Sequence, residues 1–350
     1  MDYRINFTTI SARLTSRESR STISLMNIVL AGILPPANLA PELFAYVEKD
    51  CPALVTRMQT AVIETTFLEP AELGCTPLEW IQLRQAGYEQ QPGQTVGANM
   101  ALRVAEVKDG LDPVYVAELT SVNIGRDRMS MIQPSLLEVT QAECDELFES
   151  VSMLWDGTGL SALPINARQW RVWLPEPAVM DSITPAAASN YNITDWWPQD
   201  PSLKNWRKLV NEIQMVWHDH PVNERRAELG QPPINSVWLF GGAIPRATTS
   251  ASKEAIVADL GNATNGARTL RQSDQLIDIL ASAHATHEWA AWIAGLTELN
   301  RKIQSVPRDS TLNLLGYNRI ITLTPSTPRW WHKVIRPRPT DWKSWWINQN

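Results

Sequence analysis

The sequence is short of cysteine and of long apolar runs, and each shortage excludes a class of protein. Its three cysteines, Cys51, Cys75 and Cys144, are scattered, whereas a disulfide-stapled fold needs an even, clustered set. This usage is typical of a reducing compartment, so we expect a cytoplasmic protein. The longest apolar run, residues 26–34, is too short for the roughly 18 residues of a membrane span. No membrane span is therefore predicted.

Charge is also scarce, at 19% of residues, and the net charge is −6. Duplex binding usually shows as a basic face or a high isoelectric point, so nucleic acid is not expected as a partner. Basic residues precede the 26–34 run, but Glu18 interrupts them and no small-residue cleavage site follows, which argues against a signal peptide. We expect residues 1–25 to be a flexible extension, with Met26 as an alternative translation start.

The length of 350 residues corresponds to about two domains at roughly 150 residues each. Strand-like and helix-like patterns alternate in local groups, which predicts a mixed α/β or α+β class. We expect small sheets with packed helices and a core rich in tryptophan. Beyond the extension, the predicted divisions are an N-terminal α/β region at 26–110, a central region at 111–245, and a C-terminal helical region with an aromatic tail at 246–350.

Local patterns predict the elements. Capping boxes at Thr76–Glu79 and Thr140–Glu143 mark two helix starts. Apolar alternation predicts strands at 26–34, 114–122, 128–133, 170–174 and 237–240, and a hairpin-like pair within 312–323. Helical spacing predicts helices at 43–55, 54–66, 97–107, 203–217, 274–282 and 286–305.

Most familiar catalytic motifs are missing: there is no Walker loop, no nucleophile-elbow pentapeptide and no closely spaced cysteine pair. The glycines at 157 and 159 loosely match a dinucleotide loop, but they follow a helix, so a cap and turn is expected. His218 and His220 could chelate a metal only if the helix breaks there; otherwise they complement a helix C-terminus. His284 and His287 form either a weak metal site or a surface pair. No cofactor, metal or catalytic residue is assigned.

Tryptophan is abundant, at 16 residues against 5 phenylalanines. Such rings build either an aromatic core or a stacking cleft. In the tail, 328–350, tryptophans alternate with arginine and lysine, a pattern that can bind single-stranded nucleic acid or a membrane surface. The alternative is that this terminal segment packs onto the body of the protein.

The densest pattern lies at 211–242, which reads as a helix, a proline-started turn, a short helix and a strand ending in Gly241-Gly242. The candidate ligand-binding residues in it are His220, Asn223, Arg225, Arg226 and Asn235. The asparagines flank turns, where amides satisfy free backbone groups. The arginines could hold a phosphate or a carboxylate ligand, or they could pair with nearby glutamates. An anion site and a structural latch are both compatible with this pattern.

This 211–242 block resembles a segment of the archaeal-type, cofactor-independent phosphoglycerate mutases, with its His-Pro-x-Asn, Arg, Gly and Pro-x-Asn run before a glycine-rich turn. Over roughly 26–345, the chain is more similar to the proteobacterial RpfE-type regulatory proteins, which are also phosphoglycerate-mutase-like. The features that carry this second resemblance are the strand from Met26 with its Pro35-Pro36 turn, Gly125-Arg126-Asp127-Arg128, the 211–242 block, Trp289, Trp292, the pair at 312–323 and Trp330-Trp331.

The mutase resemblance implies a serine nucleophile and two metal ions held by aspartate and histidine. The expected N-terminal Asp-Gly motif is missing here, and Asp156-Gly157 follows a helix. We therefore predict a non-catalytic regulatory or accessory protein that binds a phosphorylated metabolite or a protein partner. The alternatives are a metal-dependent phosphoryl-transfer enzyme of the mutase type, and a nucleic-acid or membrane-surface accessory protein that acts through the tail.

Overall fold

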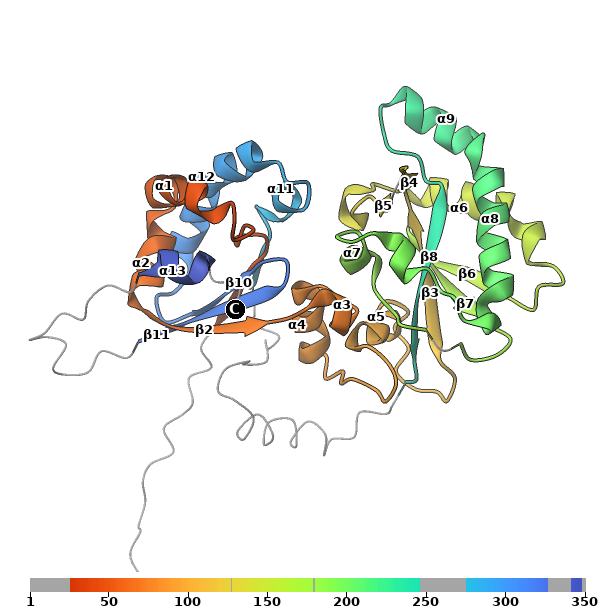
Figure 1. The fold of residues 1–350 in the computed structure, drawn as a ribbon, viewed down its shortest axis with the longest axis horizontal. Coiled ribbons are helices and arrows are strands. Elements are labelled where there is room, and N and C mark those ends of the chain that lie inside the picture. The colour runs from red at the N-terminus through yellow and green to blue at the C-terminus, as the bar shows by residue number, and fades with distance from the viewer. Residues whose placement is uncertain (1–25, 127, 179, 246–274, 327–340, 348–350) are drawn as a thin grey trace, which may run out of the picture.

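The computed structural model describes residues 26–126, 128–178, 180–245, 275–326 and 341–347. These residues form two lobes, each around its own sheet (Figure 1). Lobe I contains the five-stranded sheet of order β2-β11-β10-β1-β9, and lobe II the four-stranded sheet of order β6-β7-β3-β8. The predicted mixed class is confirmed. The extension predicted at 1–25 and most of the aromatic tail lie outside the described residues.

Lobe I combines segments from both ends of the chain. Its strands are β1 Asn27–Leu30, β2 Ala61–Phe67, β9 Gln275–Ile277, β10 Thr311–Leu315 and β11 Arg319–Pro325. Its helices are α1 Ala40–Asp50, α2 Pro52–Thr60, α11 Ala281–Ala285, α12 Trp289–Ser305 and α13 Trp342–Ile347.

Lobe II comes from the middle of the chain. Its strands are β3 Val114–Thr120, β6 Ser161–Asn166, β7 Gln169–Trp173 and β8 Ser236–Ala243, and a separate hairpin pairs β4 Val122–Ile124 with β5 Met129–Met131. Its helices, with those that connect it to lobe I, are α3 Pro70–Leu73, α4 Pro77–Gln85, α5 Asn99–Val104, α6 Gln141–Ser150, α7 Pro185–Ala188, α8 Lys204–His218 and α9 Pro221–Glu228.

The topology makes lobe II an insertion in lobe I. The chain leaves the lobe I sheet after β2 and rejoins it at β9. In that sheet β1 pairs in parallel with both β10 and β9, whereas β10, β11 and β2 pair antiparallel. The predicted regions at 26–110 and 246–350 therefore contribute strands to one sheet. The C-terminal region, which was expected to be helical, supplies three of that sheet's strands.

Tryptophan fills the core of lobe II, as the composition predicts. The Trp170 ring is fully buried and packs edge-on against Trp217, with ring centroids 5.8 Å apart. Trp206 of α8 lies in the same cluster. The amphipathic face of α8 thus covers the sheet with large aromatic groups, each of which removes much apolar surface from water.

A smaller apolar cluster joins the lobes. Val29 of β1 and Ile320 of β11 pack with Ile81 of α4 and with Leu68, which links β2 to α3. Helix α4 begins at the predicted capping box, where Thr76 and Glu79 bond reciprocally. Glu79 also accepts a hydrogen bond from the Thr184 hydroxyl at 2.8 Å. The helix that touches lobe I is thereby fastened to lobe II.

Two element predictions are wrong, and one strand was not predicted. Residues 61–67 form strand β2 instead of a helix, because a run of β-branched side chains pairs with β11 along its whole length. Residues 275–277 form strand β9, since a short apolar run cannot be assigned by periodicity alone. Strand β6 at Ser161–Asn166 was not predicted, although the turn before it was: Gly157 and Gly159 have φ of +71° and +74°.

The remaining strand predictions, the second capping box at Thr140–Glu143 and the hairpin at 312–323 are confirmed. None of the helices in the described ranges is long and apolar enough to cross a membrane.

Candidate ligand cleft between the lobes

The five predicted binding residues gather where α8, α9 and β8 meet in lobe II. Helix α8 ends at His218, and α9 begins at Pro221 with His220 as its N-cap. The His220 ring nitrogen Nδ1 accepts a hydrogen bond from the Val222 N–H at 3.2 Å. Burial lowers the pKa of His220, which favours this neutral, accepting ring. The helix does break between the histidines, but His218 is exposed and pairs with its neighbour Asp219.

Asn223 ties the start of α9 to the segment before β8. Its amide nitrogen donates to the carbonyl oxygens of Trp217 and Ile234, each at 2.8 Å, and its Oδ1 accepts from the Ile234 N–H. This use of an asparagine side chain to satisfy free backbone groups is the latch that the sequence suggested.

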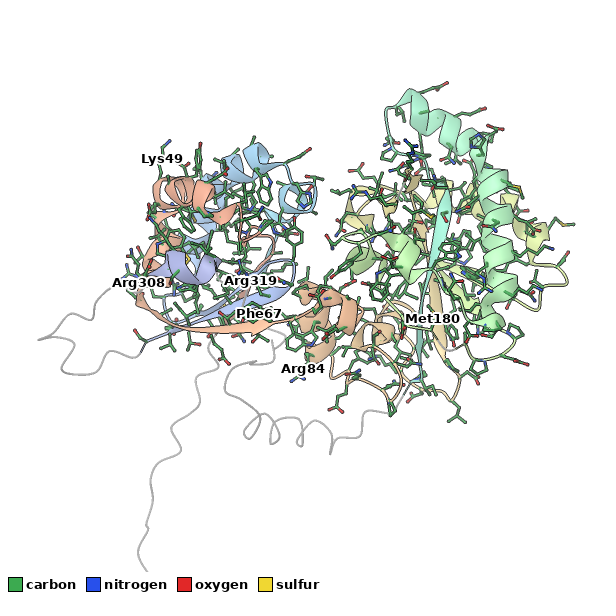
Figure 2. All side chains as sticks on the ribbon, in the orientation of Figure 1. Lys49, Phe67, Arg84, Met180, Arg308 and Arg319 are labelled. Carbon is green, nitrogen blue, oxygen red and sulfur yellow. The ribbon has the colours of Figure 1, made fainter. Side chains whose placement is uncertain are left out.

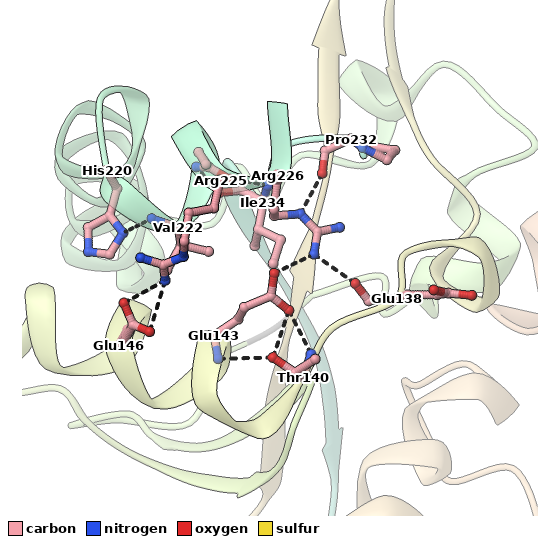
Figure 3. A network of polar contacts seen from close by, with 11 residues as sticks. Glu138, Thr140, Glu143, Glu146, His220, Val222, Arg225, Arg226, Pro232 and Ile234 are labelled. Atoms are coloured by element: carbon pink, nitrogen blue, oxygen red, sulfur yellow. Dashed lines mark hydrogen bonds and ion pairs between the residues drawn. The ribbon is translucent and has the colours of Figure 1, made fainter. Parts of the chain in front are cut away.

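The adjacent arginines differ in environment (Figure 3). Arg226 is 1% exposed and donates to Glu143 Oε1 at 2.8 Å, to the Glu138 carbonyl and to the Pro232 carbonyl. Arg225 forms a two-pronged ion pair with Glu146 at the surface. Burial opposes ionisation of Glu143, but hydrogen bonds from Thr140 and Arg226 outweigh it and lower the pKa of Glu143. These oxygens therefore already engage Nη2 of Arg225 and both Nε and Nη1 of Arg226.

Asn235 reaches the hairpin in the same way. Its Oδ1 accepts from the Val122 N–H at 2.8 Å, and its Nδ2 donates to the Val122 carbonyl at 2.9 Å. Val122 is the first residue of β4, which pairs with β5. Every predicted residue thus bonds to protein within lobe II, and Asn235 connects the 211–242 block to the β4–β5 hairpin.

That hairpin forms one wall of a cleft of about 1070 Å³ between the lobes. Lobe I contributes the Pro35-Pro36 turn, the end of α11 and the β10–β11 turn. Lobe II contributes the β5 strand and the loop after α7. The polar lining residues are Glu69, Arg128, Ser130, Gln133, Ser189, Asn190, Tyr191, Asn192, Thr286, His287, Tyr317, Asn318 and Arg319.

Arg128 supplies a positive charge to the cleft. It directly precedes β5 and is exposed, and within the described ranges its guanidinium makes no ion pair. Asn192 fixes its backbone position, because Asn192 Oδ1 accepts from the Met129 N–H at 3.1 Å. An unpaired guanidinium beside hydroxyl and amide groups is suited to bind an oxyanion.

Other charged groups of the cleft are engaged. The Tyr191 hydroxyl donates to Glu69 at 2.5 Å, and burial together with that carboxylate raises the pKa of Tyr191. Arg319 is buried and donates to the Trp346 carbonyl at 2.6 Å. The negative charge of Glu69 and the positive charge of Arg128 therefore lie in one cleft, which favours a ligand with both an anionic and a hydroxyl-bearing end.

The predicted pair of His284 and His287 lies at the cleft edge, but not as a surface pair. His284 is buried, stacks on Tyr317 with centroids 4.1 Å apart, and its Nε2 lies 2.8 Å from the Leu34 carbonyl. Because a carbonyl can only accept, Nε2 carries the proton. His287 follows the end of α11 with φ of +59° and lines the cleft. In the part of the chain that the structure describes, no three His, Cys, Asp or Glu side chains form a metal-binding group.

Sequence reasoning missed most of this cleft. Its walls come from segments as far apart as Pro36 and Asn318, and no spacing along the chain brings them together. The Gly125–Arg128 motif is the sequence signal that points to this cleft, because it contains Arg128. In the sequence it supports only the family resemblance and not a binding site. Its Asp127 lies outside the described residues.

Comparison with known proteins supports the mutase resemblance over a limited segment. No family model matches the chain. The probable 2,3-bisphosphoglycerate-independent phosphoglycerate mutase of Geobacter sulfurreducens is 28% identical over 137 residues, which is 39% of this chain and 34% of that protein. The chain therefore spans about a third of the length of this curated relative. The similarity to phosphoglycerate mutase is confirmed at this level, and the RpfE-type resemblance stays a prediction.

Solved structures give weaker likenesses. A cofactor-independent phosphoglycerate mutase from Thermoplasma acidophilum aligns over 87% of this chain and 90% of its own, with 14% identity and a TM-score of 0.32. The PH0037 protein from Pyrococcus horikoshii aligns over 87% and 88%, with 12% identity and a TM-score of 0.39. Scores this low do not define a common fold.

Proposed function

We propose that the chain is a regulatory or accessory protein of the RpfE type, similar to phosphoglycerate mutase, that binds a phosphorylated small metabolite between its lobes. The observation that carries the proposal is Arg128, a cation without an ion pair in the described ranges, on the wall of a cleft of about 1070 Å³. Clefts near this size bury most of the surface of a small organic ligand, and they occur preferentially between domains.

The lining supports a phosphorylated hydroxy acid in particular. The phosphoryl group would lie against Arg128, where a guanidinium can donate two parallel hydrogen bonds to an oxyanion. Ser130 and Asn190 lie in the same lining and offer further polar contacts. Glu69 and Tyr191 would accept hydrogen bonds from ligand hydroxyls. The 211–242 block serves this site indirectly, since Asn235 holds the β4 strand of the hairpin that presents Arg128.

The proposal of a non-catalytic role rests on the residues themselves. The N-terminal Asp-Gly pair that the mutase resemblance implies is missing, and β1 is followed by Ala31-Gly32. The cytoplasm remains the proposed compartment, because Cys51, Cys75 and Cys144 are all free and buried, as suits a reducing environment.

Calorimetric titration of the full chain with 3-phosphoglycerate tests the proposal. We expect binding that Arg128→Gln weakens at least about tenfold, because a hydrogen bond to a charged group is worth about 1.5–3 kcal/mol. Arg126→Gln is the matched control: Arg126 is exposed, neighbours the same turn and does not line the cleft. Equal affinity in the two variants would exclude Arg128 as the anion site.

The enzyme alternative is measured on the same samples. Turnover of 3-phosphoglycerate that requires added Mn²⁺ and survives repurification would overturn the non-catalytic role, whether or not Arg128 binds the substrate. Stoichiometric binding without turnover supports the regulatory role. A protein partner is compatible with either result, and its association should then depend on the bound metabolite.

A further inference from the structure

A second, smaller pocket lies in lobe I, away from the cleft. It has a volume of about 180 Å³ and is formed where α2 ends, where β2 and β10 begin, and where β11 ends. Arg308, one of its lining residues, lies on the side of lobe I that is turned away from lobe II (Figure 2). The cleft lies at the opposite ends of β1 and β10, so the two sites are separate.

One of the residues that line this pocket, Ser310, carries a buried hydroxyl group. Ser310 is 1% exposed, and its Oγ forms no hydrogen bond with any part of the chain that the structure describes. Its backbone N–H donates to the Pro307 carbonyl at 3.1 Å, which fixes the residue in place. Buried polar groups are nearly always hydrogen-bonded, because leaving one unpaired costs free energy. Rotation of the Ser310 side chain toward the pocket would let a bound ligand satisfy this hydroxyl.

Two arginines, Arg57 and Arg308, line the same pocket. Arg57 is held at the end of α12 by the carbonyl oxygens of Val306 at 3.1 Å, Pro307 at 2.7 Å and Arg308. The side chain of Arg308 is exposed and makes no ion pair within the described ranges. Burial and the nearby positive charge of Arg308 both lower the pKa of Arg57, and the charge of Asp309 acts in the opposite direction. Two like charges are thus brought near each other, and the charge of Asp309 opposes their repulsion.

We propose that this pocket binds a phosphate-sized oxyanion between Arg308, Arg57 and the Ser310 hydroxyl. The anion would neutralise the repulsion between the guanidinium groups and accept a hydrogen bond from Ser310. The remaining hydroxyls of the lining contribute less, since Thr60 already donates to the Thr56 carbonyl and Ser326 to the Thr60 carbonyl. The volume of about 180 Å³ lies below the roughly 300–1,000 Å³ of pockets for larger ligands, so a single tetrahedral group fits best.

This site differs from the cleft in function as well as in place. Arg57 connects α2 to the carboxyl end of α12, so an anion bound there would stabilise the packing of lobe I. It would do so whether or not a metabolite binds at Arg128. The proposal therefore stands or falls independently of the proposed function.

Calorimetric titration of the full chain with inorganic phosphate tests it, in an Arg128→Gln background that removes the cleft site. We expect Arg308→Gln to weaken phosphate binding at least about tenfold, because it removes a charged hydrogen bond. We expect Ser310→Ala to weaken it several-fold, because it removes a neutral hydrogen bond, which contributes less. Arg301→Gln is the matched control, since Arg301 is an exposed arginine of α12 outside the pocket. Circular dichroism melting verifies that each variant is folded.

Unchanged phosphate affinity in the folded Arg308→Gln variant overturns the proposal, and so does an equal loss in Arg301→Gln, which would show general charge attraction. A parallel titration with glycerol phosphate identifies the source of the anion. Tighter binding of inorganic phosphate supports a free ion, and tighter binding of glycerol phosphate supports the phosphoryl group of a larger molecule. Both forms of the proposal require that the affinity be lost in Arg308→Gln.

Discussion

Asn235 and Val122 form a closed pair of hydrogen bonds, in which the amide side chain accepts from the backbone N–H at 2.8 Å and donates to the carbonyl at 2.9 Å. This pair of bonds mimics one step of a β ladder. It connects the segment directly before β8 to the first residue of β4. The hairpin that carries Arg128 has only three residues in each strand. Since isolated two-stranded hairpins are marginally stable in water, we infer that Asn235, together with Asn192, sets the position of Arg128.

Replacing Asn235 with alanine should therefore weaken ligand binding without removing any group that touches the ligand. We expect the affinity for 3-phosphoglycerate to fall by less than in Arg128→Gln, and the amide protons of β4 and β5 to exchange faster. Calorimetry and hydrogen exchange measured by mass spectrometry check the two effects. Unchanged affinity for 3-phosphoglycerate, together with unchanged amide exchange in the hairpin, would contradict this positioning role.

Arg226 and Arg225 should contribute very differently to stability. Removing one partner of a buried ion pair costs about 3–5 kcal/mol, whereas an exposed pair contributes about 0–1 kcal/mol. The side chain of Arg226 is 2% exposed, and the Arg225–Glu146 pair is about half exposed. We expect Arg226→Ala to lower the free energy of unfolding by at least about 3 kcal/mol, and Arg225→Ala to have almost no effect.

Urea unfolding followed by tryptophan fluorescence measures this difference, since Trp170 and Trp217 are buried in the same lobe. The same variants test the ligand-binding role predicted from the sequence. If Arg225→Ala stays fully stable but loses affinity for 3-phosphoglycerate, the 211–242 block binds the anion after all. Retained affinity leaves the latch as its role.

The 211–242 block shows what the sequence could and could not establish. Its helix, proline-started turn and strand are local patterns, and the structure has them at 204–218, 221–228 and 236–243. The capping boxes were equally predictable, because their hydrogen bonds close within three residues. What Asn235 and Arg226 touch was not predictable, since Val122 and Glu143 are distant in sequence and no local rule selects them.

The errors have a physical cause too. Helical spacing predicts a helix over 54–66, but from Ala61 onward pairing with β11 outweighs local spacing. The ligand cleft depends on lobe II being inserted between β2 and β9, which is a property of the whole topology. Sequence therefore predicted the pieces of the Arg128 wall and missed the opposite wall around Tyr317.

His284 should make the protein less stable in mild acid. Burial lowers its pKa from 6.5 to about 4, so the unfolded chain binds a proton at higher pH than the folded chain does. Stability is then fully present above about pH 6.5 and is lost as the pH falls toward 4. The two pKa values imply a loss on the order of 3 kcal/mol, which His284→Gln should not show.

The measurement is the difference in unfolding free energy between wild type and His284→Gln at pH 7 and at pH 4.5, because other titrating groups cancel in that difference. The advantage of the wild type should shrink or reverse at the lower pH. His218→Gln is the control, since His218 is 82% exposed. A pH-independent difference between wild type and His284→Gln would show that the imidazole charges without penalty, and that the Leu34 contact does not require the neutral ring.

The end of the aromatic tail should be structural. Trp342 and Trp346 of α13 are 3% and 0% exposed, and both rings pack against Phe44 of α1. Lys343, between them, pairs with Glu48 at 2.7 Å. We expect Trp346→Ala to lower the unfolding free energy by about 3–5 kcal/mol, as for other large-to-small changes in a core.

The half-exposed Trp173 of β7 supplies the control, because Trp173→Ala removes a ring of the same size that is 45% exposed and should cost much less. Both variants are compared by urea unfolding and by binding to single-stranded oligonucleotides and to anionic vesicles. A stable Trp346→Ala protein that loses salt-sensitive binding to either would favour the alternative in which the tail is an interaction surface. Loss of stability with no such binding in the wild type means that this ring serves the core of lobe I, and that the tail is not an interaction surface for either of these two ligands.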